Sequence, residues 1–255
     1  MSDVSLRTYY EEIYHDHMMP EQEDVARNEW VLDQRAHHLA AFAREHIQDV
    51  STLLDVGSSR GHVLAVFQSQ YRADGYAVEP GSEVQPDVAR HARQVVSELN
   101  ELPEYLRGEI DLAVLSHVLE HFPDPLGFLR RLRRSWLQSD GWVLIEVPNL
   151  IWHSALELSH LTAFTADSLR NMIEAAGYRF HQLKLHGRPY SHRFPLFLLA
   201  LAKPEAEPAG SGSLSQPPPT WWLRWTRCLA RKILQITQRA LQIFMKPFRF
   251  KPWSS

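Results

Sequence analysis

The sequence contains a single cysteine, Cys228, among its 255 residues. An internal disulfide is therefore excluded, and this sparing use of cysteine fits a reducing compartment. The sequence has no run of about 18 uncharged apolar residues, so it predicts no membrane-spanning helix. Residues 1–19 are polar and acidic and have no apolar stretch, which argues against a secretory signal.

Acidic residues are absent from the last part of the chain. Residues 220–255 contain eight lysines and arginines and no aspartate or glutamate. The small net charge of −3 therefore divides into −11 on residues 1–219 and +8 on this tail. This asymmetry predicts an acidic body and a basic appendage with different partners.

Between residues 51 and 203, apolar strands alternate with helices, after a helical flank or lid in residues 1–50. Such alternation predicts an α/β fold, a three-layer Rossmann-like sandwich whose mostly parallel sheet is covered on both faces. Asp124 before Pro125, and Thr165 with Ser168, are typical helix starts. The predicted strands are 53–57, 75–80, 95–96, 110–117, 141–149, 180–186 and 194–202, and the helices between them are 62–70, 88–91, 124–137 and 165–178.

The stretch LLDVGSSRGHVL, residues 53–64, has two interpretations. Gly57, Ser59 and Gly61 spell the G-x-S-x-G of a serine hydrolase, in which Ser59 would be the nucleophile. The same glycines also fit a loop that cradles a cofactor between a strand and a helix. A tight turn without a ligand is a third possibility for the loop taken alone.

The position of the loop and of Glu79 favours the cofactor interpretation. A nucleophile elbow normally follows a central strand with several strands before it, whereas Leu53 opens the first clear strand. Glu79 ends the second strand, 18 residues after Gly61. An acid at this distance can accept hydrogen bonds from the hydroxyls of a ribose. Ser59 is then a small spacer.

Five segments in order resemble the successive motifs of class I S-adenosylmethionine-dependent methyltransferases. The resemblance covers about residues 50–203 and departs from the family pattern at Ser59, which replaces a glycine. The segments are LLDVGSSRG, YAVEP, IDLAVLSHVLEHFPDPLGFLRRL, GWVLIEVPN and HLTAFTADSLRNMIEAAGY.

The resemblance implies a cofactor site for S-adenosylmethionine. It places Asp55 and Gly57 beside the methionine moiety, with Ser59 in the loop and Gly61 closing the turn. It implies that Glu79 binds the ribose hydroxyls and that Pro80 shapes that corner. Glu98 and Leu99 become candidates for the adenine edge, and Ser116 and His117 fall where the fourth strand opens onto the methyl group.

Several histidines lie beyond the predicted strands. For a hydroxyl acceptor a histidine base suits neutral pH, and His117 and His160 are the candidates for this catalytic role. Loop hydrogen bonding is the alternative for His160. His117-x-x-Glu120-His121 also matches a zinc-binding pattern, but Pro123 and Pro125 would interrupt the helix that this pattern needs. We therefore expect no metal site.

The basic tail follows residues 204–219, which have the composition of a flexible linker. From residue 220 to residue 246, tryptophans and aliphatic residues share one helical face, and arginines and glutamines share the other. This pattern predicts an interfacial helix that binds an anionic membrane surface through residues 220–252. A helix docked on the body or on a partner protein is the alternative. Nucleic acid is not expected, because the apolar face would stay in water.

Taken together, the sequence predicts a methyltransferase domain, residues 51–203, on a membrane-surface tether. We expect transfer of a methyl group from S-adenosylmethionine to a small-molecule, glycan or lipid-linked acceptor, with O-methylation as the default. The expected location is cytoplasmic, peripherally associated with the inner face of a membrane. A catalytically inactive cofactor-fold protein and a serine hydrolase remain as alternatives.

Overall fold

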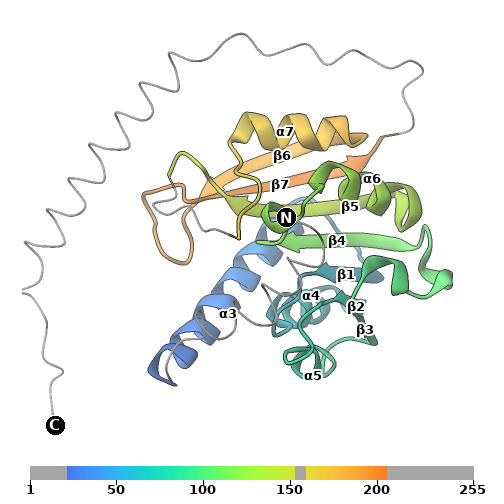
Figure 1. The fold of residues 1–255 in the computed structure, drawn as a ribbon, viewed down its shortest axis with the longest axis horizontal. Helices are drawn as coiled ribbons and strands as arrows, with labels where there is room; N and C mark the ends of the chain where they lie inside the picture. Colours follow the sequence, from blue (N-terminus) through green and yellow to red (C-terminus); the bar gives the residue numbers. More distant parts are fainter. Residues whose placement is uncertain (1–21, 153–158, 206–255) are drawn as a thin grey trace, which may run out of the picture. The chain divides into compact units, whose positions relative to one another are not determined.

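A mixed β-sheet forms the centre of the computed structural model, which describes residues 22–152 and 159–205. The sheet has the order β3-β2-β1-β4-β5-β7-β6, from β3 at the bottom to β6 at the top of Figure 1. The strands are β1 (Thr52–Val56), β2 (Asp74–Val78), β3 (Gln94–Val96), β4 (Ile110–Ser116), β5 (Leu137–Pro148), β6 (Tyr178–His186) and β7 (Phe197–Pro204).

The helices cover the sheet on both faces, as the alternation in the sequence predicts. The helices are α3 (Gln22–Arg44), α4 (His62–Tyr71), α5 (Gln85–Val88), α6 (Pro125–Ser135) and α7 (Ala166–Ala175), with 3-10 turns η2 (Leu99–Glu101), η3 (Glu104–Leu106) and η4 (Leu119–His121). In these described residues, no helix is both long and apolar enough to cross a bilayer. The linker predicted for residues 204–219 begins too early, because Pro204 still belongs to β7 and the Glu205 N–H donates a hydrogen bond to the carbonyl oxygen of Gly177. The rest of the predicted linker from residue 206, the basic tail and residues 1–21 lie outside the described residues.

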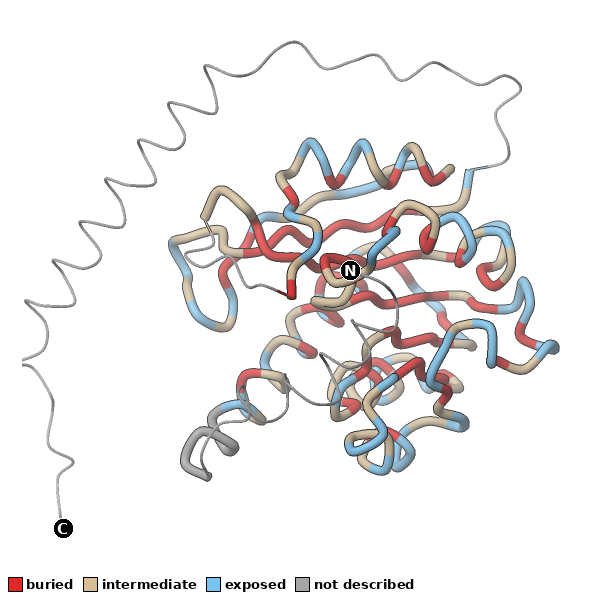
Figure 2. Tube along the Cα trace, in the orientation of Figure 1, coloured by how far each residue is buried: buried red, intermediate tan, exposed pale blue. Residues whose placement is uncertain are grey.

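Consecutive residues of each central strand face opposite layers. Leu53 belongs to the apolar cluster with α3 and α4, whereas Leu54 belongs to the cluster with α6 and α7. Leu112 and Ala113 divide in the same way. This period of two buries both faces of the sheet, and Figure 2 shows the buried strands between partly exposed helices. The predicted three-layer α/β fold is confirmed.

The strand directions place the carboxyl ends at one edge. β1 pairs in parallel with β2 and β4, and β4 pairs in parallel with β5. β7 is antiparallel to both of its neighbours, β5 and β6, so β6 has the direction of β5. The chain order reverses between β1 and β4, and ligands of such sheets bind outside the carboxyl ends at this switch point.

The predicted helix starts are confirmed in detail. The Asp124 side chain caps α6 by accepting a hydrogen bond of 2.8 Å from the Gly127 N–H. Thr165 and Ser168 form a reciprocal capping box at the start of α7. These pairs satisfy backbone donors that no helical carbonyl can reach.

Several predicted boundaries differ from the observed ones, including those of β5, α5 and β7, which begins at Phe197 and not at residue 194. β5 begins at Leu137 and not at Gly141, because Leu137 already pairs with Ile110 before a shift of register in the ladder. Gly141 lies at this irregularity, where a Cβ would stand 2.8 Å from the carbonyl oxygen of Ile110. The helix predicted at 88–91 is α5, which ends at Val88.

Candidate active site

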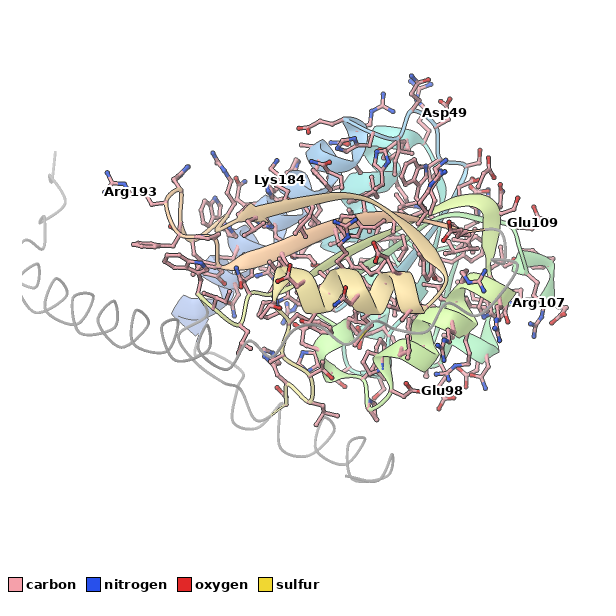
Figure 3. All side chains as sticks on the ribbon, turned by 90° about the horizontal axis from the view of Figure 1, so that it is seen from above. Asp49, Glu98, Arg107, Glu109, Lys184 and Arg193 are labelled. Atoms are coloured by element: carbon pink, nitrogen blue, oxygen red, sulfur yellow. The ribbon has the colours of Figure 1, made fainter. Side chains whose placement is uncertain are left out.

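The buried polar residues of the described chain gather at the carboxyl edge of the sheet. Charged side chains such as Arg107, Glu109 and Arg193 project outward in Figure 3. Four carboxylates are nevertheless almost fully buried, which costs free energy unless a partner or ligand compensates. The complete buried polar set is Asp55, Ser58, Glu79, Glu120, Glu146, Asn149, Ser159 and His186.

The loop after β1 has an unusual backbone. Gly57, Ser59 and Gly61 all have positive φ, at 71°, 49° and 82°. Glycine adopts this conformation without penalty, whereas a serine pays about 1 kcal/mol. A Cβ at Gly57 would also lie 2.7 Å from Cγ2 of Val118. The requirement for a glycine at position 57 is therefore steric as well as conformational.

The Glu79 carboxylate closes this loop against β2. Its Oε2 accepts a hydrogen bond of 2.6 Å from the Ser59 N–H, and its Oε1 accepts one of 2.8 Å from the Gly81 N–H. Each carboxylate oxygen can accept a second hydrogen bond. Two backbone N–H groups thus hold Glu79 in place at the end of β2, where the family resemblance puts an acceptor for the ribose hydroxyls.

Asp55 ends the apolar run of β1 and is only 1% exposed. Burial, and to a smaller extent the negative charge of Glu79, together raise the pKa of its carboxyl to about 8. Among the described residues, neither Asp55 Oδ2 nor the buried Ser58 hydroxyl has a hydrogen-bond partner. These two oxygens fit a cationic, hydrogen-bonding ligand, as the ammonium of the methionine moiety of S-adenosylmethionine would be.

The other predicted cofactor residues lie around this cradle. Pro80 is exposed directly after Glu79. Glu98 is exposed and caps η2, while Leu99 packs against the core cluster. Their contacts with adenine stay a prediction, as do the other cofactor contacts carried over from the family.

A second polar group surrounds Glu146, which lies in β5 and is 1% exposed. The Ser116 hydroxyl donates a hydrogen bond of 2.9 Å to Oε2. Nε2 of His117 lies 3.3 Å from Oε2, and Nε2 of His186 lies 3.1 Å from Oε1. Nε of Arg35, on α3, lies 3.5 Å from Oε2. Four elements, α3, β4, β5 and β6, thus meet at one carboxylate, together with His117 from the loop after β4.

These neighbours decide the charge of Glu146. Burial acts to raise the pKa of the carboxyl, but the rings of His117 and His186 and the Arg35 guanidinium oppose it. The net result is a pKa well below the ordinary value of a glutamate. Glu146 is therefore an anion at neutral pH, and it can orient the histidines beside it.

His117 follows β4 with a φ of 55°, a strained conformation for a side chain of this size. Its ring packs edge-on against Phe197, with 5.0 Å between the ring centroids. Nδ1 lies 3.6 Å from Oε1 of Glu120. Strain of this kind concentrates at functional sites.

His160 reaches the same carboxylate from the other side. Its Nε2 lies 4.0 Å from Oε1 of Glu120, and its ring packs edge-on against His121, with centroids 4.8 Å apart. The two histidines predicted as candidate bases are thus brought to one buried glutamate, although 43 residues separate them in the sequence.

Sequence reasoning missed Arg35, Glu146 and His186. Glu146 had a visible signal, because it is the one charged residue in the apolar segment GWVLIEVPN. Arg35 and His186 had none, since an arginine on an amphipathic helix and a histidine at a strand end are common without function.

The comparisons with known proteins decide the family. A model of a methyltransferase domain matches residues 28–183. The chain belongs to this methyltransferase family. Together with the sheet order, this confirms the predicted class I S-adenosylmethionine-dependent methyltransferase and its cofactor. The role of the individual residues in the 53–64 stretch stays a prediction.

Solved structures share the fold of this methyltransferase. The 1,6-didemethyltoxoflavin-N1-methyltransferase of Burkholderia thailandensis, solved with 1,6-didemethyltoxoflavin and S-adenosylhomocysteine, is 22% identical, with a TM-score of 0.61 over 80% of this chain and 88% of that one. A SAM-dependent methyltransferase of Archaeoglobus fulgidus is 19% identical, with a TM-score of 0.51 over 66% and 94%. One from Aquifex aeolicus is 14% identical, with a TM-score of 0.54 over 79% and 98%. A search of curated proteins gives no match.

Proposed function

We propose that this methyltransferase methylates a hydroxyl group of a small-molecule acceptor and that His117 accepts the hydroxyl proton. The observation that carries the proposal is the position of His117 at the carboxyl end of β4, the strand next to β1 and its cofactor loop. Cofactor and base are thus expected on either side of the switch point of the sheet.

The reaction is an in-line displacement at the methyl carbon of the sulfonium. The acceptor oxygen forms a bond to this carbon while the bond from carbon to sulfur breaks, and the electron pair stays on sulfur. The proton leaves the hydroxyl for a ring nitrogen of His117. Alignment of the acceptor and exclusion of water supply the remaining catalysis.

Glu146 supports this role of His117. Its carboxylate lies 3.3 Å from Nε2 and is held by Arg35 and by the Ser116 hydroxyl. A buried anion beside the ring orients the imidazole and stabilises the imidazolium that forms when the ring accepts a proton. Arg35 comes from α3, so this helix supplies part of the acceptor side as well as covering the sheet.

The test measures cofactor binding and methyl transfer separately. Purified protein is titrated with S-adenosylmethionine by calorimetry, and label from the methyl group is then followed into the small-molecule, lipid and glycan fractions of a cell extract. We expect binding by the wild type and by His117→Gln, and a loss of transfer of about 10²–10⁴-fold in the variant. The matched control is His37→Gln, on the exposed face of α3.

The two outcomes that contradict the proposal are distinct. Cofactor binding without transfer to any fraction would favour the inactive binding protein. Full transfer by His117→Gln would exclude this residue as the base. The argument for a hydroxyl acceptor, which depends on a histidine base, would then fail as well.

The basic tail supports a finer proposal, that the acceptor is a glycan or lipid-linked molecule at an anionic membrane surface. The support is the sequence of residues 220–246 alone, with its tryptophan-rich face and its arginines. Full-length protein should sediment with phosphatidylglycerol vesicles, and the chain truncated after residue 203 should stay in the supernatant. Equal sedimentation of both proteins would contradict the proposal.

A further inference from the structure

Glu120, His121 and His160 form a cluster of possible metal ligands beside the proposed base. Each of these residues offers one ligand atom, and the three atoms lie within 4.8 Å of one another. Neighbouring ligands of one ion, with bonds of about 2.1 Å at octahedral or tetrahedral angles, are about 3.0–3.4 Å apart. Side-chain rotations that bring the three atoms closer by up to about 1.5–2 Å would therefore let them share one ion.

Backbone contacts hold the two segments of this cluster together. Glu120 and His121 lie in η4, directly after β4, while His160 belongs to the stretch before α7. The Thr162 N–H donates a hydrogen bond of 3.0 Å to the carbonyl oxygen of Glu120. The position of His160 near η4 is thus fixed by main-chain contacts as well as by its own side chain.

The His121 ring is held in the tautomer that binds metals. Its Nδ1 lies 3.1 Å from the carbonyl oxygen of Ser159, which can only accept a hydrogen bond. In the neutral ring Nδ1 then carries the proton, and Nε2 is the nitrogen that can ligate a metal ion. Histidines that ligate metals commonly donate their other ring N–H to a carbonyl in this way.

The chemistry of the cluster suits a divalent transition-metal ion. Two imidazoles and one carboxylate leave coordination positions open, and this ligand set is typical of first-row metals with an exchangeable site. Glu120 is 1% exposed, so a nearby positive charge would offset the cost of burying its carboxylate.

We propose that Glu120, His121 and His160 bind a divalent transition-metal ion whose open positions take an oxygen of the methyl acceptor. The site itself needs only the three residues, whereas this role rests on the proposed function. His117 lies 3.6 Å from the same glutamate, so the ion would stand next to the proposed base. There it would withdraw electron density from the acceptor hydroxyl and ease the loss of its proton.

The proposal replaces our expectation from the sequence that no metal binds. That expectation considered a helix carrying His117, Glu120 and His121. In the structure the cluster needs no such helix, because η4 is a short turn and the third ligand comes from a separate segment. His117 contacts Glu120 and stays outside the set of three.

The test uses Co²⁺ alone, because the visible absorption of this ion reports its coordination. Full-length protein without an affinity tag is stripped with a chelator and titrated, and equilibrium dialysis measures the bound metal. We expect saturation at one equivalent in the wild type. His160→Ala and His121→Ala should each weaken binding at least 100-fold and remove the absorption bands of the bound ion. His37→Ala is the matched control and should bind like the wild type.

Two results would overturn the site, and neither depends on methyl transfer. One is the absence of saturable binding in the wild type, and the other is unchanged binding and absorption in His160→Ala. Circular dichroism and titration with S-adenosylmethionine show that each variant is folded. If Co²⁺ binds as expected but methyl transfer fails, the proposed function is wrong and the metal site stands.

Discussion

The predicted cofactor side and the proposed acceptor side of the carboxyl edge are built in different ways. The predicted cofactor cradle uses Asp55, Gly57, Ser59 and Glu79, which lie at the ends of the adjacent strands β1 and β2 and all fall within residues 55–79 of the chain. The acceptor side takes Arg35 from α3, Ser116 from β4, Glu146 from β5 and His186 from β6. The first is a local structure of one short segment, and the second exists only when distant elements meet.

This difference shows which part of an enzyme of this kind a sequence pattern can describe. A cofactor common to a whole family needs the same backbone turn and the same acid at a similar spacing. An acceptor site is supported by a network whose members have no fixed spacing. Four variants test this comparison, in order of decreasing expected effect.

The largest effect is expected for Glu146→Gln. The variant removes the buried charge but keeps the shape, so Arg35, His117 and His186 lose their shared anion. We expect a loss of about 3–5 kcal/mol in the free energy of unfolding at pH 7, measured in urea. Glu104→Gln is the control, because its side chain is 81% exposed and its pair with Arg107 is solvated. The control should change stability by less than about 0.5 kcal/mol.

The pH dependence gives the sign of this contribution. The pKa of Glu146 is lowered by folding, so its stabilisation is present above the ordinary pKa of glutamate and is lost as pH falls toward the lower value. The difference between wild type and Glu146→Gln should therefore shrink only below about pH 4. A constant difference at all pH values would show that charge is not the cause.

Glu79→Ala tests the cofactor side. The variant removes the carboxylate predicted to accept hydrogen bonds from the ribose hydroxyls, and with it the hydrogen bonds that the Ser59 and Gly81 N–H groups donate. We expect the affinity for S-adenosylmethionine, measured by calorimetry, to fall by about 100-fold, or about 3 kcal/mol. The control is Glu109→Ala, which changes an exposed glutamate outside the predicted cofactor cradle. This variant should bind S-adenosylmethionine like the wild type. An unchanged affinity in Glu79→Ala would contradict the assigned role.

From the raised pKa of Asp55 we predict that the affinity for the cofactor depends on pH. Its carboxyl is protonated at pH 6 in the free protein, because its pKa is raised to about 8. The ammonium group of the cofactor favours the carboxylate, so binding releases a proton and affinity rises with pH. Between about pH 5.5 and 7.5 we expect a rise of up to about tenfold per pH unit. Calorimetry in buffers of different ionisation enthalpy counts the released proton.

Asp55→Asn is the matched variant for this prediction. It keeps the shape of the side chain but cannot titrate, so its weaker binding should not vary with pH over the same range. A wild-type affinity that falls or stays level as the pH rises would contradict the prediction.

The smallest effect is expected for Ser59→Gly. Glycine removes the strain of a side chain at positive φ but loses more entropy on folding, so stability should rise by no more than about 1 kcal/mol. The N–H that donates to Glu79 is kept, and cofactor affinity should not change. Ser59→Ala keeps the strain and should gain no stability in the same urea titration. Loss of methyl transfer in Ser59→Gly would show that the Ser59 side chain has a role in function.

The sequence predicted the fold well because burial follows the local pattern. Leu53 and Leu54 alternate between two layers, and Asp124 and Thr165 mark helix starts by chemistry that acts within three residues. The predictions were weaker where the limits of a strand depend on its pairing with a distant strand. The early start of β5 at Leu137 depends on Ile110, which no local pattern shows.

The features of the candidate site that could not be predicted from the sequence also depend on groups far apart along the chain. The raised pKa of Asp55 could not be foreseen, because it depends on complete burial and on Glu79 across the loop. The meeting of His117 and His160 at Glu120 depends on the contact of Thr162 with η4. These effects arise from distances through space between groups far apart along the chain.

By itself the sequence determined the layered α/β fold, the glycine loop with its acid at the second strand, and the membership of a cofactor-binding family. Short-range sterics and alternating burial act on neighbouring residues, so they can be read along the chain. Only the tertiary structure decided that Arg35, His117 and His186 share the buried Glu146 and that Glu120, His121 and His160 converge. The electrostatic energy of such groups depends on their separation and burial in space, and folding alone sets both.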